Sequence, residues 1–293
     1  MTMALNTPAP SALHRLWTGT NVIQKVAFAV GLALLLMAFL GPLIAPHDPN
    51  AQSLLSRLRP PIGFDRAKVA YPLGTDELGR DVLSRSLHGL RLTLMLAILG
   101  ALLGLLVGGL LGLLAGVVGG RTDAAIISAV DTQIAVPFTL IALFTLAIFG
   151  SSLQVMVIVL GLAGWEQYAR IVRGDVRRLM HLPFIEAARA AGASPRRIAF
   201  THLLPNIVSP LVVQFTLSLS NIVLLESTLS FLGLGVQPPT ATLGSMVGIG
   251  RDYMPTAPWI VIVPAALIVL LTFAVQVVGD WLRDSVDVRL RAR

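Results

Sequence analysis

The sequence is poor in the residues that soluble enzymes use. It contains no cysteine, which excludes a disulfide framework, thiol catalysis and thiolate metal sites. Charged residues make up only 13% of the chain, about half of the ~25% that is usual in soluble domains. Lysine is nearly absent, and neither Lys25 nor Lys68 lies in the Gly-Lys-Ser/Thr setting of a P-loop. A soluble globular enzyme and an ATPase activity of the chain itself are therefore both excluded.

Long apolar runs are what the chain has instead. Of its 293 residues, 55% are hydrophobic, and the mean hydropathy is +0.79. A helix needs roughly 20 apolar residues to cross about 30 Å of hydrocarbon. Six segments are long enough, namely residues 26–45, 92–120, 124–149, 153–172, 205–231 and 256–279. The expected fold class is therefore all-α, a polytopic membrane protein with six transmembrane helices.

An even number of spans places both termini on one side of the membrane. With the termini in the cytoplasm, 14 of the 22 Lys and Arg residues lie inside and 8 outside, as the positive-inside rule favours. The first apolar run is too long for the core of a signal peptide, so we expect an uncleaved anchor. The net charge of +7 comes from short basic runs beside apolar segments, which is typical of contact with lipid headgroups rather than nucleic acid.

This topology predicts how the chain is divided. The parts are a cytoplasmic N-terminal segment (1–25), a first transmembrane helix (26–45), an external loop (46–91), a five-helix core (92–279) that includes a cytoplasmic loop (173–204), and a cytoplasmic tail (280–293).

The external loop contains a group of acidic residues. We expect Thr75 to cap an amphipathic helix that begins at Asp76 and Glu77 and lies at the outer membrane interface. These two acids and Asp81 also suggest a metal site. An acid-rich helix N-terminus is the simpler explanation, because no histidine or fourth carboxylate is close. No metal or other cofactor is expected.

The loop after the fourth span carries the signals of an isolated short helix. Pro183 suits the first position of a helix, Glu186 complements the positive end of the helix dipole, and Gly192 supplies a left-handed stop. Ser194 and Pro195 indicate the cap and first residue of a second helix that runs into the fifth span. These residues alone leave two interpretations open: a docking element for a partner, or an ordinary connector on the membrane surface.

The same loop resembles a known motif. Glu186, Ala187 and Ala188, then Gly192, then a segment ending in Leu204-Pro205, are similar to the EAA loop of permease subunits in binding-protein-dependent ABC importers. Four further segments resemble the C-type subunit of the dipeptide, oligopeptide and nickel importers. They are LGTDELGRDVLSR (73–85), ARIVR (169–173), LSFLGLG (229–235) and GDWLRD (279–284).

The resemblance implies an assembly rather than a lone transporter. A type I ABC importer permease of this kind pairs with a second, homologous permease and with two ATP-binding subunits in a bacterial cytoplasmic (inner) membrane. An external binding protein, periplasmic or lipid-anchored, would deliver the peptide or similar small solute. By the same resemblance, the helix around Glu186 docks into a groove on the ATPase and couples hydrolysis to transport.

The second span has an unusual glycine pattern. Six glycines recur at a strict spacing of four, so that they form a ridge that winds slowly round the helix. Such a ridge permits close helix packing, either within the subunit or against a partner permease. The glycines are Gly100, Gly104, Gly108, Gly112, Gly116 and Gly120.

Two acidic residues lie inside predicted spans, and they support a rival function. Asp131 and Glu226 are candidates for a proton relay, which a self-sufficient secondary carrier or channel would use. Both lie near the end of a span, which favours hydrogen-bonded structural or gating roles. A membrane enzyme or scaffold is a third class, but no nucleophile, base and acid fall on one face. A carrier gives no reason for the short helix around Glu186, so the importer is the preferred function.

Overall fold

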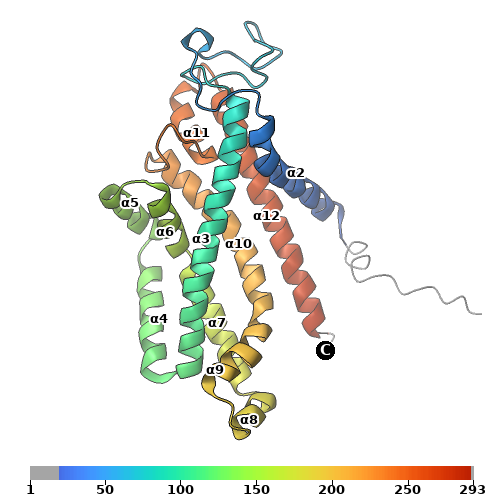
Figure 1. Ribbon diagram of the computed structural model, residues 1–293, viewed down its shortest axis with the longest axis vertical. Coiled ribbons are helices and arrows are strands. Elements are labelled where there is room, and N and C mark those ends of the chain that lie inside the picture. Colours follow the sequence, from blue (N-terminus) through green and yellow to red (C-terminus); the bar gives the residue numbers. More distant parts are fainter. Residues whose placement is uncertain (1–19, 292–293) are drawn as a thin grey trace, which may run out of the picture.

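The computed structural model describes residues 20–291, which form an elongated helical bundle (Figure 1). Residues 1–19 and 292–293, which belong to the expected N-terminal segment and tail, lie outside the described residues. The elements in order are α2 (Val22–Ile44), η1 (Leu54–Ser56), α3 (Val82–Val118), α4 (Gly120–Ala135), α5 (Phe138–Phe149), α6 (Leu153–Leu162), α7 (Trp165–Met180), α8 (Pro183–Ala190), α9 (Pro195–Arg197), the π-helix η2 (Ile198–Leu203), α10 (Leu204–Phe231), α11 (Leu243–Gly250), η3 (Arg251–Tyr253) and α12 (Trp259–Arg291).

Five helical segments are long and apolar enough to cross a membrane, and a bent pair brings the number to six. The bent pair is α4 and α5, whose axes differ by 87°. The span expected over 124–149 is therefore present as a broken helix and not as one continuous helix. Val136 adopts an extended conformation ahead of Pro137, and proline disfavours the helical conformation in the residue before it. The five unbroken spans are Val22–Ile44, Val82–Val118, Leu153–Met180, Pro195–Phe231 and Trp259–Ser285.

Helix α3 is the central element of the bundle (Figure 1). It packs against α2, α6, α7 and α10, and α12 packs against α2 and α10. The largest apolar cluster lies among these helices, with Leu96, Leu160 and Leu229 fully buried within it. With 37 residues, α3 is about 55 Å long, roughly 25 Å more than the hydrocarbon core of a bilayer.

The helix expected to begin at Asp76 begins instead at Val82. Asp81 is its N-cap, and the carboxylate accepts hydrogen bonds from the backbone amides of Leu83 and Ser84. The hydroxyl oxygen of Thr75 accepts from the Arg59 amide over 2.9 Å and donates to the carbonyl of Ser56, so it caps no helix. The predicted interfacial helix is therefore the first part of the long α3.

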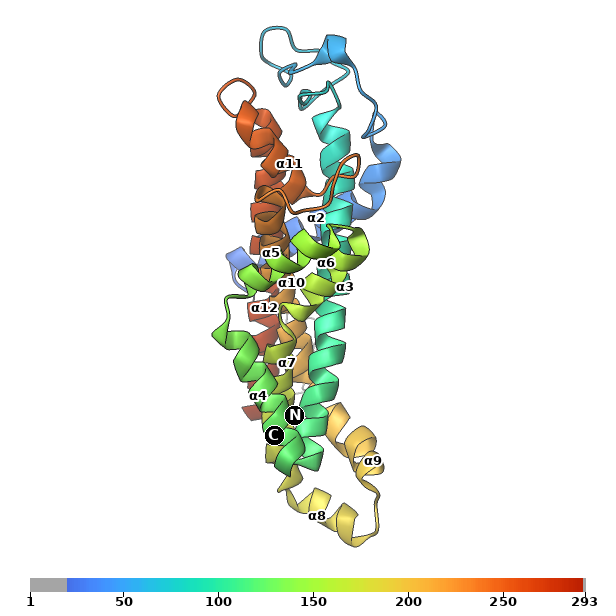
Figure 2. The same ribbon diagram turned by 90° about the vertical axis from the view of Figure 1, so that its left-hand side faces the viewer.

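Residues 45–81, which we call the cap, cover one end of the bundle, and α8 lies at the opposite end (Figures 1 and 2). A buried ionic cluster holds the cap together. The Asp76 carboxylate lies 2.6 Å from Nε of Arg80 and 3.4 Å from Nε of Arg85. Indole Nε1 of Trp259 donates to the carbonyl of Thr75 over 3.1 Å, which ties the cap to the start of α12.

Two helix ends differ from the expected division of the chain. The first helix begins at Val22 rather than at residue 26, because Asn21 and Gln24 form a capping box. Helix α12 continues without a break through residues 279 and 280, where the tail was expected to begin. Residues 280–291 are therefore a helical extension of the expected sixth span.

Candidate functional site

Helix α8 forms the end of the bundle opposite the cap (Figure 2). Pro183 is its first residue and Glu186 lies in its first turn, as the sequence predicts. Ile185 is fully buried and joins an apolar cluster that includes Val176 of α7 and Leu203 of η2. The helix is eight residues long, too short to be stable alone, so this anchor holds it on the bundle.

The surface that α8 exposes consists of small apolar side chains and one acidic side chain that has no partner within residues 20–291. The side chains of Glu186 and Ala187 are exposed, and Ala188 is partly buried. Glu186 makes no side-chain hydrogen bond or ion pair within residues 20–291. Phe184 is 42% and Phe200 is 62% exposed nearby. This surface has the features of a contact that a second protein completes.

Gly192 permits the chain to reverse after α8. Its φ is +79°, a left-handed conformation that L-residues with a side chain rarely adopt, and no atom lies within 4 Å of a Cβ placed there. Ser194 then caps α9, and its hydroxyl accepts from the Arg197 amide over 3.3 Å. From α9 the helix runs through η2 into α10, so that α8 lies between two membrane helices, α7 and α10.

The glycine ridge of α3 lies against α6 and α7 of the same chain. At each of the first five glycines, an added Cβ would lie 3.0 Å or less from an atom of these helices, in several cases a backbone carbonyl. Gly120 is different, because it begins α4 and has no neighbour within 4 Å of a Cβ. The close contact therefore ends at Gly116, and it belongs to the subunit itself. The glycines in it are Gly100, Gly104, Gly108, Gly112 and Gly116.

This packing determines which face of α7 stays open. Tyr168, Ala169 and Val172 are buried toward α3, whereas Gln167 and Arg170 are exposed on the other side. A membrane-depth helix with one apolar and one strongly polar face cannot present the polar face to lipid at low cost. The polar face of α7 must therefore meet water or protein.

Helix α4 covers part of this polar face through ion pairs with α7. Asp123 accepts hydrogen bonds from the guanidinium groups of both Arg173 and Arg177. Asp131, the first of the two intramembrane candidates, accepts from Arg170 over 2.7 Å, and both side chains of that pair are more than half exposed. Asp131 is thus a charge-paired residue at an open surface, which is the setting of a structural ion pair rather than of a buried relay.

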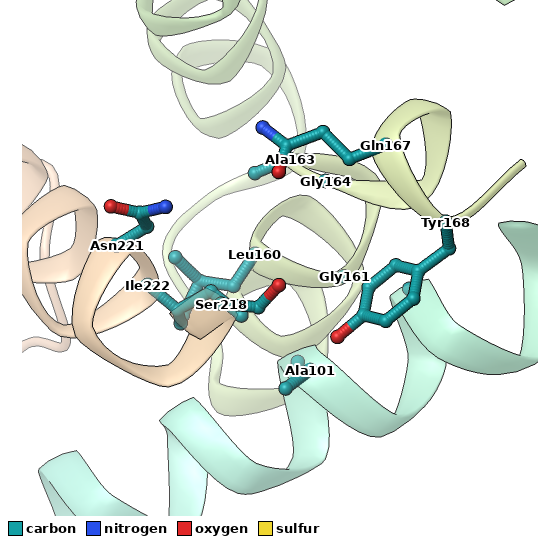
Figure 3. Close-up of a pocket in the computed structure, with 12 residues that line it drawn as sticks. Ala101, Leu160, Gly161, Ala163, Gly164, Gln167, Tyr168, Ser218, Asn221 and Ile222 are labelled. Carbon is teal, nitrogen blue, oxygen red and sulfur yellow. The ribbon is translucent and has the colours of Figure 1, made fainter. Parts of the chain in front are cut away.

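Further polar groups continue this face toward α10. The carboxamide of Gln214 on α10 donates to the Gln167 side chain over 2.7 Å. A small cavity lies beside them, and Figure 3 shows the hydroxyl groups of Tyr168 and Ser218 pointing into it with Asn221 at its rim. Its volume of about 20 Å³ admits no more than about one water molecule. In this conformation the cavity is therefore not a site for a solute.

Glu226, the second intramembrane candidate, lies far from Asp131 and close to the cap end. Its Oε1 accepts hydrogen bonds from Ser230 and from Thr242, each over 2.7 Å. Its Oε2 is buried without a partner and lies against Gly244, where a Cβ would be 3.0 Å away. Thr242 is the N-cap of α11. Glu226 therefore fastens α11 to α10 and lies apart from Asp131, so the two acids form no common relay.

Residues 108–291 match the family described as binding-protein-dependent transport system inner membrane component. Residues 22–61 match the N-terminal TM domain of oligopeptide transport permease C. The first match covers well over half of the chain and includes α7, α8 and most of the glycine ridge. The chain belongs to this permease family. It is a multi-pass membrane component of a transport system, and a self-sufficient carrier or channel finds no support.

Permeases of known name match along almost the whole length. The di/tripeptide transport system permease protein DppC of Pseudomonas aeruginosa (strain UCBPP-PA14) is 39% identical over 285 residues, 96% of this chain and 94% of that protein. The dipeptide transport system permease protein DppC of Escherichia coli (strain K12) is 38% identical over 285 residues, 97% and 94% of the two chains. These relatives are named as transport permeases.

Solved structures of the MetNI methionine ABC transporter in inward-facing conformations have the same fold. One chain is 25% identical with a TM-score of 0.52, covering 68% of this permease and 95% of that chain. A second has 26% identity and a TM-score of 0.53, covering 67% and 94%. The similarity supports the type I importer permease fold that the motifs imply.

Sequence reasoning missed two parts of the site. It did not identify Asp123 as a partner of α7, although arginines at positions 170, 173 and 177 share one helix face at a spacing of three and four. It also did not predict the polar contact between Gln167 and Gln214, because nothing in the sequence places α7 beside α10. The arginine spacing was a usable signal, and the glutamine contact carried none.

Proposed function

We propose that this chain is one of two transmembrane subunits of an ATP-driven importer for di- or oligopeptides or a similar small solute. The exposed, unpaired surface of α8 is the observation that carries the proposal, because it is anchored by Ile185 and offers Glu186 and Ala187 to a partner. In this proposal α8 docks on a separate ATP-binding subunit, of which the assembly has two. The peptide-transport names of the relatives support the solute class.

The proposed orientation puts α8 and both termini in the cytoplasm and the cap outside, where a binding protein delivers the solute. The charge distribution supports a cytoplasmic position for α8, because residues 166–204 contain seven of the 22 basic residues and basic loops favour the cytoplasmic side. The absence of native cysteine allows a clean test. Ala51→Cys in the cap and Ala190→Cys in α8 are both at exposed positions. They should label from opposite sides with a membrane-impermeant thiol reagent, and labelling from the same side would reject the orientation.

We propose that the polar face of α7 and α10 forms one wall of the pathway along which the solute crosses the membrane. Gln167, Gln214 and Asn221 lie on it at membrane depth, where contact with lipid would cost several kcal/mol for each unsatisfied group. A second, homologous permease would close the other side. Asn221→Cys should then react with a small hydrophilic thiol reagent in the assembled transporter, and Leu110→Cys, which is exposed on α3, should not. Equal reactivity at the two positions would contradict this assignment.

Uptake measurements separate the importer from the carrier. We expect a labelled dipeptide to enter proteoliposomes only when ATP, the ATP-binding subunits, the second permease and the external binding protein are all present. Accumulation by the chain alone under a proton gradient would overturn the proposal. An uptake that needs all the partners but accepts only a different solute would correct the solute class and leave the assembly intact.

A further inference from the structure

Helices α2 and α3 enclose an apolar groove of about 210 Å³ on the outside of the bundle. Seven of its eight lining residues are apolar, and the eighth is Arg91. Phe39 is 66% exposed, and Leu35 and Met95 are 43% and 45% exposed. Helix α2 packs only against α3 and α12 among the main contacts of the bundle, so this side of the groove has no covering helix within residues 20–291.

Arg91 is exposed and has no partner in this part of the chain. No hydrogen bond or ion pair joins it to any residue between 20 and 291. Every other residue of the groove is apolar, so the guanidinium has no acceptor near the groove walls. An unpaired guanidinium beside hydrocarbon is costly unless an anion or water meets it. The groove thus combines an apolar slot with one unsatisfied cation.

The position of Arg91 along α3 places it at the edge of the hydrocarbon. It is the tenth residue of α3, and the next 29 residues, 92–120, contain no charge. Leu94, Met95 and Ile98 follow it at spacings of three, four and seven, which keeps them on the same face and deeper in the membrane. Side chains on a helix lean toward its N-terminus, so the guanidinium of Arg91 points toward the cap end and the headgroups.

We propose that this groove binds one glycerophospholipid with an anionic headgroup, such as phosphatidylglycerol. The guanidinium of Arg91 holds the phosphodiester through charge-assisted hydrogen bonds, and one acyl chain lies in the slot between Leu35, Phe39 and Met95. Charge complementarity selects this occupant, because arginine matches a phosphate in geometry and the slot matches an acyl chain in polarity. The chain extends inward from the phosphate, as the order of Arg91, Met95 and Ile98 along α3 requires.

The bound lipid would fill the space between α2 and α3. The two helices touch closely at Gly41, where a Cβ would lie 2.9 Å from Leu87, and the groove lies one turn further from the cap. An acyl chain in the groove extends this contact along the helices. Binding of the lipid therefore stabilises the attachment of α2 by mass action.

Native mass spectrometry of the assembled transporter tests the site. The probes are phosphatidylglycerol and phosphatidylcholine with the same acyl chains, added to delipidated complex. We expect one tightly retained phosphatidylglycerol for each copy of this chain, and we expect Arg91→Gln to weaken its retention at least about tenfold, the loss typical for a hydrogen bond to a charged group. Arg121→Gln, at an exposed arginine at the start of α4, is the matched control and should change nothing.

A second variant fills the slot and keeps the charge. Met95→Trp should also abolish selective retention, and it replaces Arg91→Gln in the test if that variant does not assemble. Three results would overturn the proposal: equal retention of the two lipids, which indicates ordinary boundary lipid; unchanged retention in Arg91→Gln or Met95→Trp; and no retained lipid because a partner subunit covers the groove.

Discussion

The cap contains a cluster of charged side chains that is buried and paired, whereas the acidic side chain of α8 is exposed and has no partner within residues 20–291. In the cap, Asp76 accepts from Arg80 and lies near Arg85, and the exposed fractions of these residues are 4% or less. In α8, the side chain of Glu186 is exposed and has no partner within residues 20–291. The difference agrees with the proposal that α8 docks on another protein, whereas the ionic cluster of the cap is satisfied within the single chain.

This comparison predicts how each end responds to mutation. Changes in the cap should cost folding stability, since they leave buried charges without partners. Changes in α8 should cost transport while the protein stays folded, since nothing in the subunit depends on its exposed face. The α3–α7 contact joins the two ends, so damage there should affect both.

Gly108→Leu should have the largest effect. A Cβ at this position overlaps the backbone carbonyl of Trp165, which cannot move without displacing α7. The cost should exceed the ~1–3 kcal/mol that is typical of overpacked cores. We expect little folded protein in the membrane by fluorescence-detected size exclusion, and Leu106→Ile, at a residue 58% exposed on the same helix, should behave as the wild type. A normal amount of folded Gly108→Leu would show that α7 can separate from α3.

Asp76→Ala should be the most destabilising change in the cap. It removes the carboxylate that meets Arg80 and Arg85, so that Arg85 loses its acidic partner and Arg80 is left with Glu77 alone. Breaking a buried ion pair in this way costs about 3–5 kcal/mol. A clear fall in the thermal unfolding midpoint of the purified subunit is expected, and Asp252→Ala, at an exposed surface pair, should leave the midpoint nearly unchanged. Equal midpoints for the two variants would mean that the cluster does not hold the cap.

Gly192→Val and Glu186→Lys should be mild for folding and severe for transport. Valine at a φ of +79° costs roughly 1–2 kcal/mol locally, and the lysine alters only an exposed surface. Both variants should reach the membrane at normal levels, lose uptake and retain less ATP-binding subunit on copurification. Ala191→Val, at the neighbouring residue with a φ of −77°, is the control for added bulk. Wild-type uptake in both variants, with the ATP-binding subunits still attached, would make α8 a simple connector.

Glu77→Gln should have the smallest effect, seen mainly in the pH dependence of stability, because the glutamine oxygen can still accept the hydrogen bond from Arg80. Burial, and next the nearby Asp76 carboxylate, raises the pKa of Glu77 above its usual 4.5. The folded protein then binds the proton more tightly than the unfolded chain, so ionisation of Glu77 lowers stability as the pH rises above 4.5. Removing the group should flatten the fall of the unfolding midpoint as the pH rises above 4.5. An unchanged slope would show that Glu77 does not contribute to the pH dependence.

Local signals in the sequence predicted the α8 end better than the cap end. Pro183, Gly192 and Ser194 each act through their own backbone, and the structure has the helix start, the left-handed turn and the cap at these residues. The helix expected at Asp76 is wrong because the Thr75 hydroxyl accepts from the Arg59 amide, 16 residues away, and Asp81 caps the helix instead. Such long-range competition leaves no trace in a local pattern.

The remaining contacts that the sequence did not predict depend on how each helix is rotated about its own axis. The glycine spacing predicted a close contact for α3, but only the structure identifies α6 and α7 as the helices in that contact. Once α7 is fixed in this way, its arginines face Asp123 and Asp131 of α4. The six apolar runs could be predicted from the order of residues along the chain. The ion pairs depend on the orientation of two helices about their axes.

The break at Val136 and Pro137 has a consequence for the electrical integrity of the membrane. Helices α4 and α5 have 16 and 12 residues, about 24 and 18 Å, so neither crosses the hydrocarbon alone and their junction lies within it. Apart from the Gln133 carbonyl, which accepts from the Val136 amide, the carbonyl groups in the last turn of α4 lack helical donors and need water or protein at that depth. A hydrated junction shortens the insulating layer that separates the two compartments. We therefore expect the second permease proposed above to supply the side chains that seal the resting transporter against leakage of protons and ions.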